Sequence, residues 1–196
     1  MTETWKPGQP IRLETPRFQL DSLTRLQVVW NTFHWTKDPA IMNPFGLEAG
    51  TWTRRSWYRR YRKLNNRRKF AFGIRPKGES KLIGLEIVDV SGHNVASLSV
   101  LIGDRDWWGR GVVQESRKAV INFLFGKVGC VRVWGTPSSR NFPSIFNYQK
   151  LGFTCEGALR QQGFDPATKQ RTDFIVFAML RDEWLAKHGQ QQGATA

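Results

Sequence analysis

The stretch Asp104-Arg105-Asp106-Trp107-Trp108-Gly109-Arg110-Gly111-Val112-Val113 decides how this chain is interpreted. It carries two glycines, Gly109 and Gly111, separated by one residue, and residues 114–125 after it have helical spacing. Glycine permits backbone angles that let successive N–H groups converge on an anion, and the dipole of the following helix also favours negative charge. The stretch therefore predicts a phosphate-binding turn.

The segments on either side of this turn support that interpretation. Before it, residues 97–102 alternate polar and apolar side chains and then become fully apolar, as expected for a half-buried strand. After it, apolar and small residues recur on one helical face, namely Val112, Val113, Ser116, Ala119, Val120, Phe123 and Leu124. The unit is predicted to be a strand, a glycine-rich turn and a helix.

Length and composition indicate one folded domain. The 196 residues are 40% hydrophobic and 13% aromatic, which suffices for a single sizeable core. Cys130 and Cys155 lie far apart and show neither metal-ligand spacing nor a disulfide framework, so we expect free thiols and no metal site. The N-terminus lacks the apolar core of a signal peptide, and no run approaches the roughly 20 apolar residues of a membrane helix. We therefore expect a cytoplasmic protein.

The positive charge is concentrated in one segment. The formal net charge is +14, and a field of this strength attracts anions. No acidic residue lies between Glu48 and Glu79, whereas the same segment contributes most of the excess charge through Arg54, Arg55, Arg59, Arg60, Arg62, Lys63, Arg67, Arg68, Lys69, Arg75 and Lys77. Trp57, Tyr61 and Leu64 recur at helical spacing, which predicts that these side chains pack in the core while the arginines occupy the other faces.

The remaining pattern predicts the order of elements. A first strand at 17–20 precedes a helix at 24–35 that is apolar at Leu26, Val29, Trp30 and Phe33. A basic helix follows, capped by Thr53 or Ser56 and ended at residues 65–66. Further strands are expected at 70–75, 81–90, 128–136, 153–164 and 171–180, and a further helix at 141–153. We expect a flexible N-terminus at 1–10, one domain at 11–185 and a flexible tail at 186–196.

The element order and two motifs resemble the GNAT acyltransferase superfamily. Trp107-Trp108-Gly109-Arg110-Gly111 is similar to its acyl-CoA pyrophosphate loop. Asn141, Ser144, Tyr148 and Lys150-Leu151-Gly152-Phe153 are similar to its second cofactor motif. The resemblance covers roughly residues 11–185. It implies an α/β (α+β) fold with a mixed, mostly antiparallel central sheet of about seven strands flanked by helices.

Three further segments resemble the RimJ/RimL-like branch, which acetylates protein N-termini and various small amines. They are Leu13-Glu14-Thr15-Pro16-Arg17-Phe18, Glu156-Gly157-Ala158-Leu159-Arg160 and Met179-Leu180-Arg181-Asp182-Glu183-Trp184. The chain departs from the pattern at Asp106, where many relatives carry Gln or Arg. It also has Ser97 where the branch often has a glutamate, so Ser97 is expected near the acceptor.

The resemblance implies acetyl-CoA as the acyl-donor cosubstrate. The glycine-rich loop would hold its pyrophosphate, and strand backbone amides would bind the pantetheine arm and the oxyanion. The implied cofactor-binding residues are Val100, Leu101, Ile102, Trp108, Gly109, Arg110, Gly111, Val112, Val113, Asn141, Ser144 and Tyr148.

Acyl transfer to an amine needs an unprotonated amine and a proton for the departing thiolate. Tyr148, four residues before Gly152, is the candidate general acid, with a core or interfacial tyrosine as the alternative. Glu86 is a candidate base, acting directly or through water, and the alternative is a solvated or hydrogen-bonded strand carboxylate. His34 and Trp35 are candidates for the acceptor site, with a structural role as the alternative.

Three classes of function remain open at this stage. The first is an N-acyltransferase acting on a primary amine, as a monomer or homodimer, with a protein N-terminus, a ribosome- or RNA-associated molecule, or a small metabolite or antibiotic as acceptor. The second is an RNA- or ribosome-binding module with a degenerate CoA site, and the third is a CoA-sensing regulatory domain. The basic segment suits RNA, the ribosome or an acidic protein, with a solvated helix face as the alternative.

Overall fold

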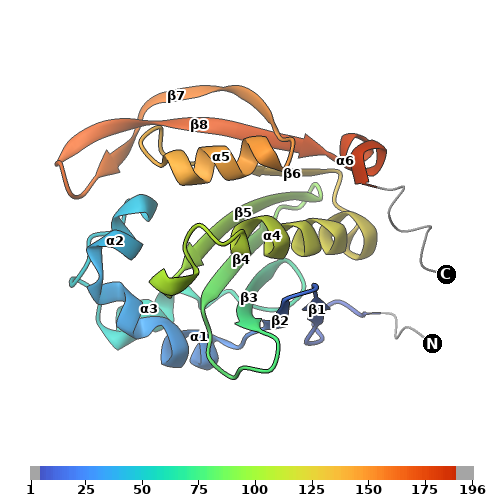
Figure 1. Cartoon of the computed structure of the whole chain (residues 1–196), viewed down its shortest axis with the longest axis horizontal. Coiled ribbons are helices and arrows are strands. Elements are labelled where there is room, and N and C mark those ends of the chain that lie inside the picture. Colours follow the sequence, from blue (N-terminus) through green and yellow to red (C-terminus); the bar gives the residue numbers. More distant parts are fainter. Residues whose placement is uncertain (1–4, 189–196) are drawn as a thin grey trace.

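The computed structural model describes residues 5–188, which form one eight-stranded sheet flanked by helices (Figure 1). The strand order is β1-β2-β3-β4-β5-β6-β8-β7, and every neighbouring pair is antiparallel except β5 and β6. The strands are β1 (Arg12–Glu14), β2 (Phe18–Ser22), β3 (Lys69–Pro76), β4 (Gly84–Val90), β5 (Val95–Ile102), β6 (Arg132–Gly135), β7 (Thr154–Asp165) and β8 (Gln170–Leu180).

The helices divide between the two faces of this sheet. They are α1 (Arg25–Thr32), α2 (Pro39–Met42), α3 (Arg54–Arg60), α4 (Val112–Phe123), α5 (Phe142–Lys150) and α6 (Arg181–His188), with short helical turns η1 (Phe33–Lys37), η2 (Asn43–Phe45), η3 (Arg105–Trp107) and η4 (Leu124–Val128). Figure 1 shows α1, α2 and α3 grouped together, apart from α4 and α5. None of the helices in the described part of the chain has the length and apolar character needed to span a bilayer.

Strand alternation builds two hydrophobic cores, one on each face. Phe70, Phe72 and Leu98 point to the face covered by α4, α5 and α6. Ala71 and Leu101 point to the opposite face, where they pack under α1, η1 and α3. Trp57 and Tyr61 belong to this second core, as their helical spacing predicted, and their exposed fractions are 1% and 6%.

The observed elements follow the predicted order with differences in number and bounds, and helix α2 was not expected. The sheet has eight strands rather than about seven, because the chain turns between β1 and β2, where the Thr15 N–H donates to the Phe18 carbonyl. The strand expected at 81–90 begins at Gly84. The basic helix ends at Arg60, ahead of the expected residues 65–66. Helix α6 was not expected.

The expected flexible termini lie partly outside the described residues. Residues 1–4 and 189–196 are not described, whereas residues 186–188 belong to α6. Within the N-terminal segment the Trp5 ring packs against Phe123, with ring centroids 5.1 Å apart. Trp5 therefore contacts the core of the domain, and residues 186–188 complete its last helix.

Gly103 offers a test of this packing. A Cβ placed on Gly103 would lie 1.9 Å from Trp35 Cε2, because the indole covers the backbone at the end of β5. We expect Gly103→Ala to lower the free energy of unfolding by about 1–3 kcal/mol, since the ring must shift. Gly126→Ala is the matched control, because nothing lies within 4 Å of its Cβ position. Urea unfolding of both variants measures the difference, and equal stability would contradict the packing.

Candidate cofactor and active site

The turn between β5 and α4 presents unpaired backbone N–H groups. Gly109 and Gly111 have φ angles of +72° and +74°, a conformation that glycine adopts without strain. Gly111 is the N-cap residue of α4 and supplies no side-chain cap. The N–H groups of Val112 and Val113 in the first turn of α4 therefore face outward at the positive end of the helix dipole. This geometry fits an anionic phosphate.

The turn is fixed from behind by residues near the N-terminus. Arg17 donates from Nη1 to the Arg110 carbonyl at 3.0 Å and from Nε to Glu115 Oε2 at 2.6 Å. Thr15 Oγ1 donates to Glu115 Oε1 at 2.6 Å. Although burial works in the opposite direction, these hydrogen bonds hold the pKa of Glu115 below its usual value. Arg17 thus offsets the one carboxylate in the first turn of α4, which would otherwise repel an anion.

The two tryptophans of the turn have different roles. Trp107 packs beneath the turn against Phe18, with ring centroids 5.5 Å apart. Trp108 is 43% exposed and donates from Nε1 to the Ile102 carbonyl at 3.0 Å. Asp106 is exposed, while Arg105 turns away to pair with Asp38. The exposed Asp106 side chain is compatible with a phosphate site because it stays in water.

The two halves of the sheet separate after a short parallel contact. β5 pairs with β6 only from Val95 to Ser97, opposite Arg132 to Trp134. Beyond this point the Leu98 carbonyl accepts from Tyr148, so the backbone of Leu98 faces the opening and not β4. By strand alternation Val100 and Ile102 also face the opening, whereas Leu101 points its N–H toward β4. Of the three expected backbone ligands, Val100 and Ile102 therefore face the opening, and Leu101 faces β4.

Tyr148 lies where the two halves separate. Its side chain is 2% exposed, and its hydroxyl donates to the Leu98 carbonyl at 3.3 Å. A Cβ on Gly135 of β6 would lie 1.9 Å from this hydroxyl, so glycine is needed there to admit the ring. Burial raises the pKa of Tyr148, the positive charge of Arg117 opposes that rise, and the phenol remains protonated at neutral pH. The structure therefore brings Tyr148 and the free backbone of β5 together.

A buried ion pair lies beside Tyr148. Arg117 and Glu86 are 1% and 0% exposed, and Arg117 Nε lies 3.6 Å from Glu86 Oε1. Ser116 Oγ donates to the same oxygen at 3.2 Å, and the Arg117 guanidinium lies 4.8 Å from the centre of the Tyr148 ring. Burial raises the pKa of Glu86 to about 6, against the lowering effects of Arg117 and Ser116. The sequence reasoning did not identify Arg117.

These contacts define the surroundings of Glu86, the candidate base. Its carboxylate points toward α4 and is covered by it, so an acceptor amine from solvent has no access to it. Oε2 of Glu86 and both Nε and Nη1 of Arg117 have no hydrogen-bond partner among residues 5–188. In the structure Glu86 pairs with Arg117 beside Tyr148, and its carboxylate is shielded from solvent.

Asn141 and Ser144 shape the start of α5. The Asn141 side chain accepts from the Ser144 N–H at 3.2 Å and donates to the Pro44 carbonyl at 3.4 Å. Gln114 ties α5 to α4 by donating to the Asn147 side chain at 2.7 Å. Asn141 therefore positions the helix that carries Tyr148, and its amide is already engaged within the protein.

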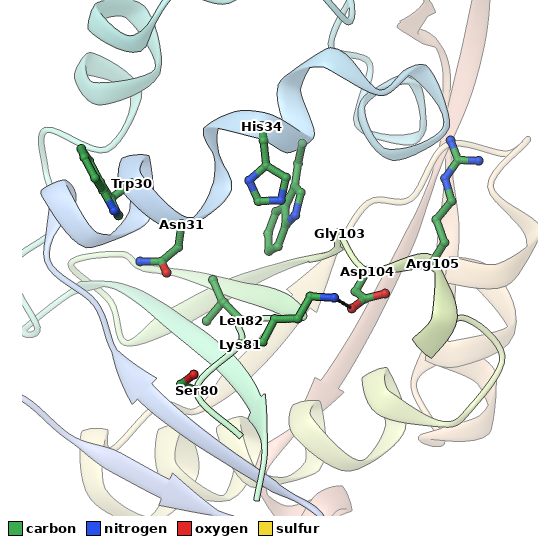
Figure 2. Close-up of a pocket in the computed structure, with 10 residues that line it drawn as sticks. Trp30, Asn31, His34, Ser80, Lys81, Leu82, Gly103, Asp104 and Arg105 are labelled. Atoms are coloured by element: carbon green, nitrogen blue, oxygen red, sulfur yellow. Dashed lines mark ion pairs between the residues drawn. The ribbon is translucent and has the colours of Figure 1, made fainter. Parts of the chain in front are cut away.

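His34 and Trp35 line a separate pocket of about 430 Å³ (Figure 2). Lys81 and Asp104 pair at 2.6 Å on its floor, and burial together with the charge of Lys81 lowers the pKa of His34. Trp35 packs on Gly103, five residues beyond Leu98, which corresponds to about 16 Å along a strand. The structure thus separates His34 and Trp35 from Tyr148.

Ser97 lies at the last parallel pair between β5 and β6, opposite Trp134. Its hydroxyl donates to the Asp89 carbonyl at 3.5 Å. By alternation with Leu98 its side chain lies on the sheet face opposite α4. Ser97 is therefore the sequence neighbour of Leu98, which binds Tyr148, but its side chain points to the opposite face of the sheet.

A family model described as the acetyltransferase (GNAT) domain matches residues 22–154. Since this is more than half of the chain, the protein belongs to the GNAT acetyltransferase domain family. The SPbeta prophage-derived uncharacterized N-acetyltransferase YokL of Bacillus subtilis is 37% identical over 81 residues. That match covers 41% of this chain and 45% of YokL, so the chain spans less than half of this relative.

Solved structures share the fold at low sequence identity. Spermidine N-acetyltransferase from Vibrio cholerae, in complex with CoA and spermine, has a TM-score of 0.75 and 18% identity over 86% of this chain and 98% of that one. Mycobacterium smegmatis RimJ in complex with CoA-disulfide has a TM-score of 0.73 and 18% identity over 94% and 98% of the two chains. These likenesses establish the GNAT fold.

The buried pair of Arg117 and Glu86 can be tested by a double-mutant cycle. Arg117→Met should lower the free energy of unfolding by about 3–5 kcal/mol, because it leaves a buried carboxylate without its cation. Adding Glu86→Leu should restore most of that loss, since two apolar side chains need no pairing. Urea unfolding of both singles and the double measures the coupling. Additive losses would show that the two residues do not interact.

Proposed function

We propose that this protein transfers an acyl group, acetyl in the first instance, from a CoA thioester to a primary amine. One arrangement carries the proposal. The free backbone of Val100, the N-terminal turn of α4 and the Tyr148 hydroxyl all border the opening where β5 leaves β6. The first two bind an extended cofactor, and the third supplies a proton at its reactive end.

The chain's own residues fit acetyl-CoA in separate parts. The N–H groups at Gly109, Gly111, Val112 and Val113 suit the pyrophosphate, and a Cβ at Gly109 would meet nothing within 4 Å, so the approach is open. The backbone of Val100 suits the amides of the pantetheine arm, as an added strand would pair with it. Bound in this way, acetyl-CoA supplies an activated thioester.

In the proposed reaction the amine nitrogen forms a bond to the thioester carbonyl carbon, and the C–S bond then breaks. The Val100 N–H, fixed in its strand, donates to the oxyanion that develops between these events. The Tyr148 phenol gives its proton to the departing sulfur, and the surplus proton of the amine goes to water. Arg117 stabilises the phenolate that remains, because its charge lies 4.8 Å from the ring.

The acceptor amine needs little help from a protein base if it is an α-amine. An α-amine with a pKa near 8 is about one-tenth neutral at pH 7, whereas a lysine side chain is neutral only about once in 2,500 molecules. This favours a protein N-terminus, consistent with the fold shared with RimJ. The net charge of +14 disfavours a polycationic acceptor such as a polyamine, despite the fold shared with spermidine N-acetyltransferase.

The direct test incubates the protein with acetyl-CoA and separate panels of α-amino peptides, tRNAs and small amines. Mass spectrometry should detect a gain of one acetyl group on α-amino peptides, and free thiol release should match it. Acetylation confined to a small amine would support the small-molecule alternative. Acetyl-CoA binding without thiol release on any panel would overturn acyl transfer and favour a binding module.

Gly111→Val should weaken acetyl-CoA binding while leaving the core intact. A β-branched side chain at φ +74° is strained, and it would crowd the N-terminal turn of α4 next to Arg17. We expect at least a tenfold rise in the dissociation constant measured by calorimetry. Gly129→Val, with a φ angle of +77° after η4, controls for backbone strain alone. Unchanged binding by Gly111→Val would place the cofactor elsewhere.

Tyr148→Phe should lower kcat by about 10²- to 10⁴-fold, the usual contribution of a general acid. KM for acetyl-CoA should change little, because the hydroxyl acts on the leaving sulfur and not on the phosphates. Tyr61→Phe removes a hydroxyl from a buried tyrosine of the other core and should retain activity. Near-normal turnover by a folded Tyr148→Phe protein would remove Tyr148 from the mechanism.

A further inference from the structure

An open groove lies between α1 and α3, on the sheet face opposite α4 and α5. We call it the Trp30 groove; its volume is about 680 Å³, and it is lined by Leu26, Val29, Trp30, Arg54 and Tyr58, among others. The exposed fractions of Trp30 and Leu26 are 80% and 69%, although both belong to the apolar pattern of α1. Trp30 and Leu26 therefore form an exposed apolar patch at the groove, which is a candidate surface for binding a ligand.

Arg54 and Arg55 line this groove, and they belong to a run of arginines that form no ion pair with the described residues. Among residues 5–188, no ion pair involves Arg54, Arg55, Arg59, Arg60, Arg62, Arg67 or Arg68, and all seven are exposed. On α3, Arg55 and Arg59 lie four positions apart and therefore share one side of the helix. Both side chains are exposed, so this side carries two positive charges that face solvent.

Guanidinium groups and aromatic rings are already interleaved here. The Arg25 guanidinium lies 3.9 Å from the centre of the Tyr58 ring, and that of Arg54 lies 5.7 Å from Trp30. Arg25 therefore covers Tyr58, whereas Trp30 keeps most of its surface free. The groove therefore combines the exposed indole of Trp30 with arginines that have no carboxylate partner among the described residues.

We propose that the Trp30 groove binds single-stranded nucleic acid. An unpaired base stacks on the free face of Trp30, while the phosphates on either side of it contact Arg54, Arg55 and Arg59. An acidic peptide would satisfy the arginines but would bring no flat ring for Trp30. The inference is independent of acyl transfer, because the groove and the proposed cofactor site lie on opposite faces of the sheet.

Fluorescence anisotropy of the full chain with a labelled 12-nucleotide RNA tests this proposal. Trp30→Ala should weaken binding by about 5- to 150-fold, the usual effect of losing one base–aromatic stack, whereas Trp30→Phe should retain most affinity. Arg54→Gln with Arg55→Gln and Arg59→Gln should reduce the slope of log affinity against log salt by about 2, because each phosphate contact contributes about 0.7. DNA of the same sequence shows whether the 2′-hydroxyl contributes.

A charge-matched control separates a site from general attraction. Arg160→Gln with Arg171→Gln and Arg181→Gln removes three exposed charges from β7, β8 and α6, and it should weaken RNA binding much less. Circular dichroism melting confirms that each variant is folded. Equal weakening by both triple variants, no effect of Trp30→Ala, or tighter binding of a polyglutamate peptide than of RNA would each overturn the proposal.

Discussion

The parallel contact between β5 and β6 is the constraint on which the proposed site depends. Three residues of each strand pair, and the strands then diverge. If β5 and β6 paired over more residues, the backbone groups of Leu98 and Val100 would bond to β6. If they paired over fewer, the two halves of the sheet would not be joined. The protein itself fills two of the free acceptors, through Tyr148 at Leu98 and Trp108 at Ile102. These two contacts lie on either side of Val100, and the backbone N–H and carbonyl of Val100 between them face the opening.

The electrostatics of the site have two separate sources. At the turn, Arg17 offsets Glu115, so the helix dipole of α4 acts on an incoming anion without a competing carboxylate. At Tyr148, Arg117 provides a positive charge that solvent does not screen, because the side chain is buried. The negative charge of Glu86 offsets the desolvation cost of burying Arg117. The resulting environment keeps the phenol protonated while limiting the cost of removing its proton. In the proposed mechanism one charge pair therefore serves binding and the other serves proton transfer.

The strand, turn and helix around Gly109 were predictable because their signals are local, as periodicity and glycine spacing act within a few residues. The pairing of Glu86 with Arg117 was not predictable from spacing, because the two lie 31 positions apart on different elements. One signal was present, since Arg117 interrupts the apolar face that contains Val120 and Ile121. The direction of the Leu101 N–H depends on strand parity, which only the observed register with β4 determines. Periodicity likewise marked Trp30 as apolar without showing that its face of α1 stays uncovered.

The concentration of arginines on α3 is not explained by what that helix does in the fold. Its Trp57 and the following Tyr61 anchor it in the core, and its capping box needs only Thr53 and Ser56. The other positions are free to carry any soluble side chain, and mixed charges would stabilise the helix better than a single sign. Like charges at such spacing repel one another and lower stability, so folding alone gives no reason for them. An anion bound in the proposed Trp30 groove would offset that cost, and the exposed ring of Trp30 lies beside Arg54 and Arg55 in the same groove.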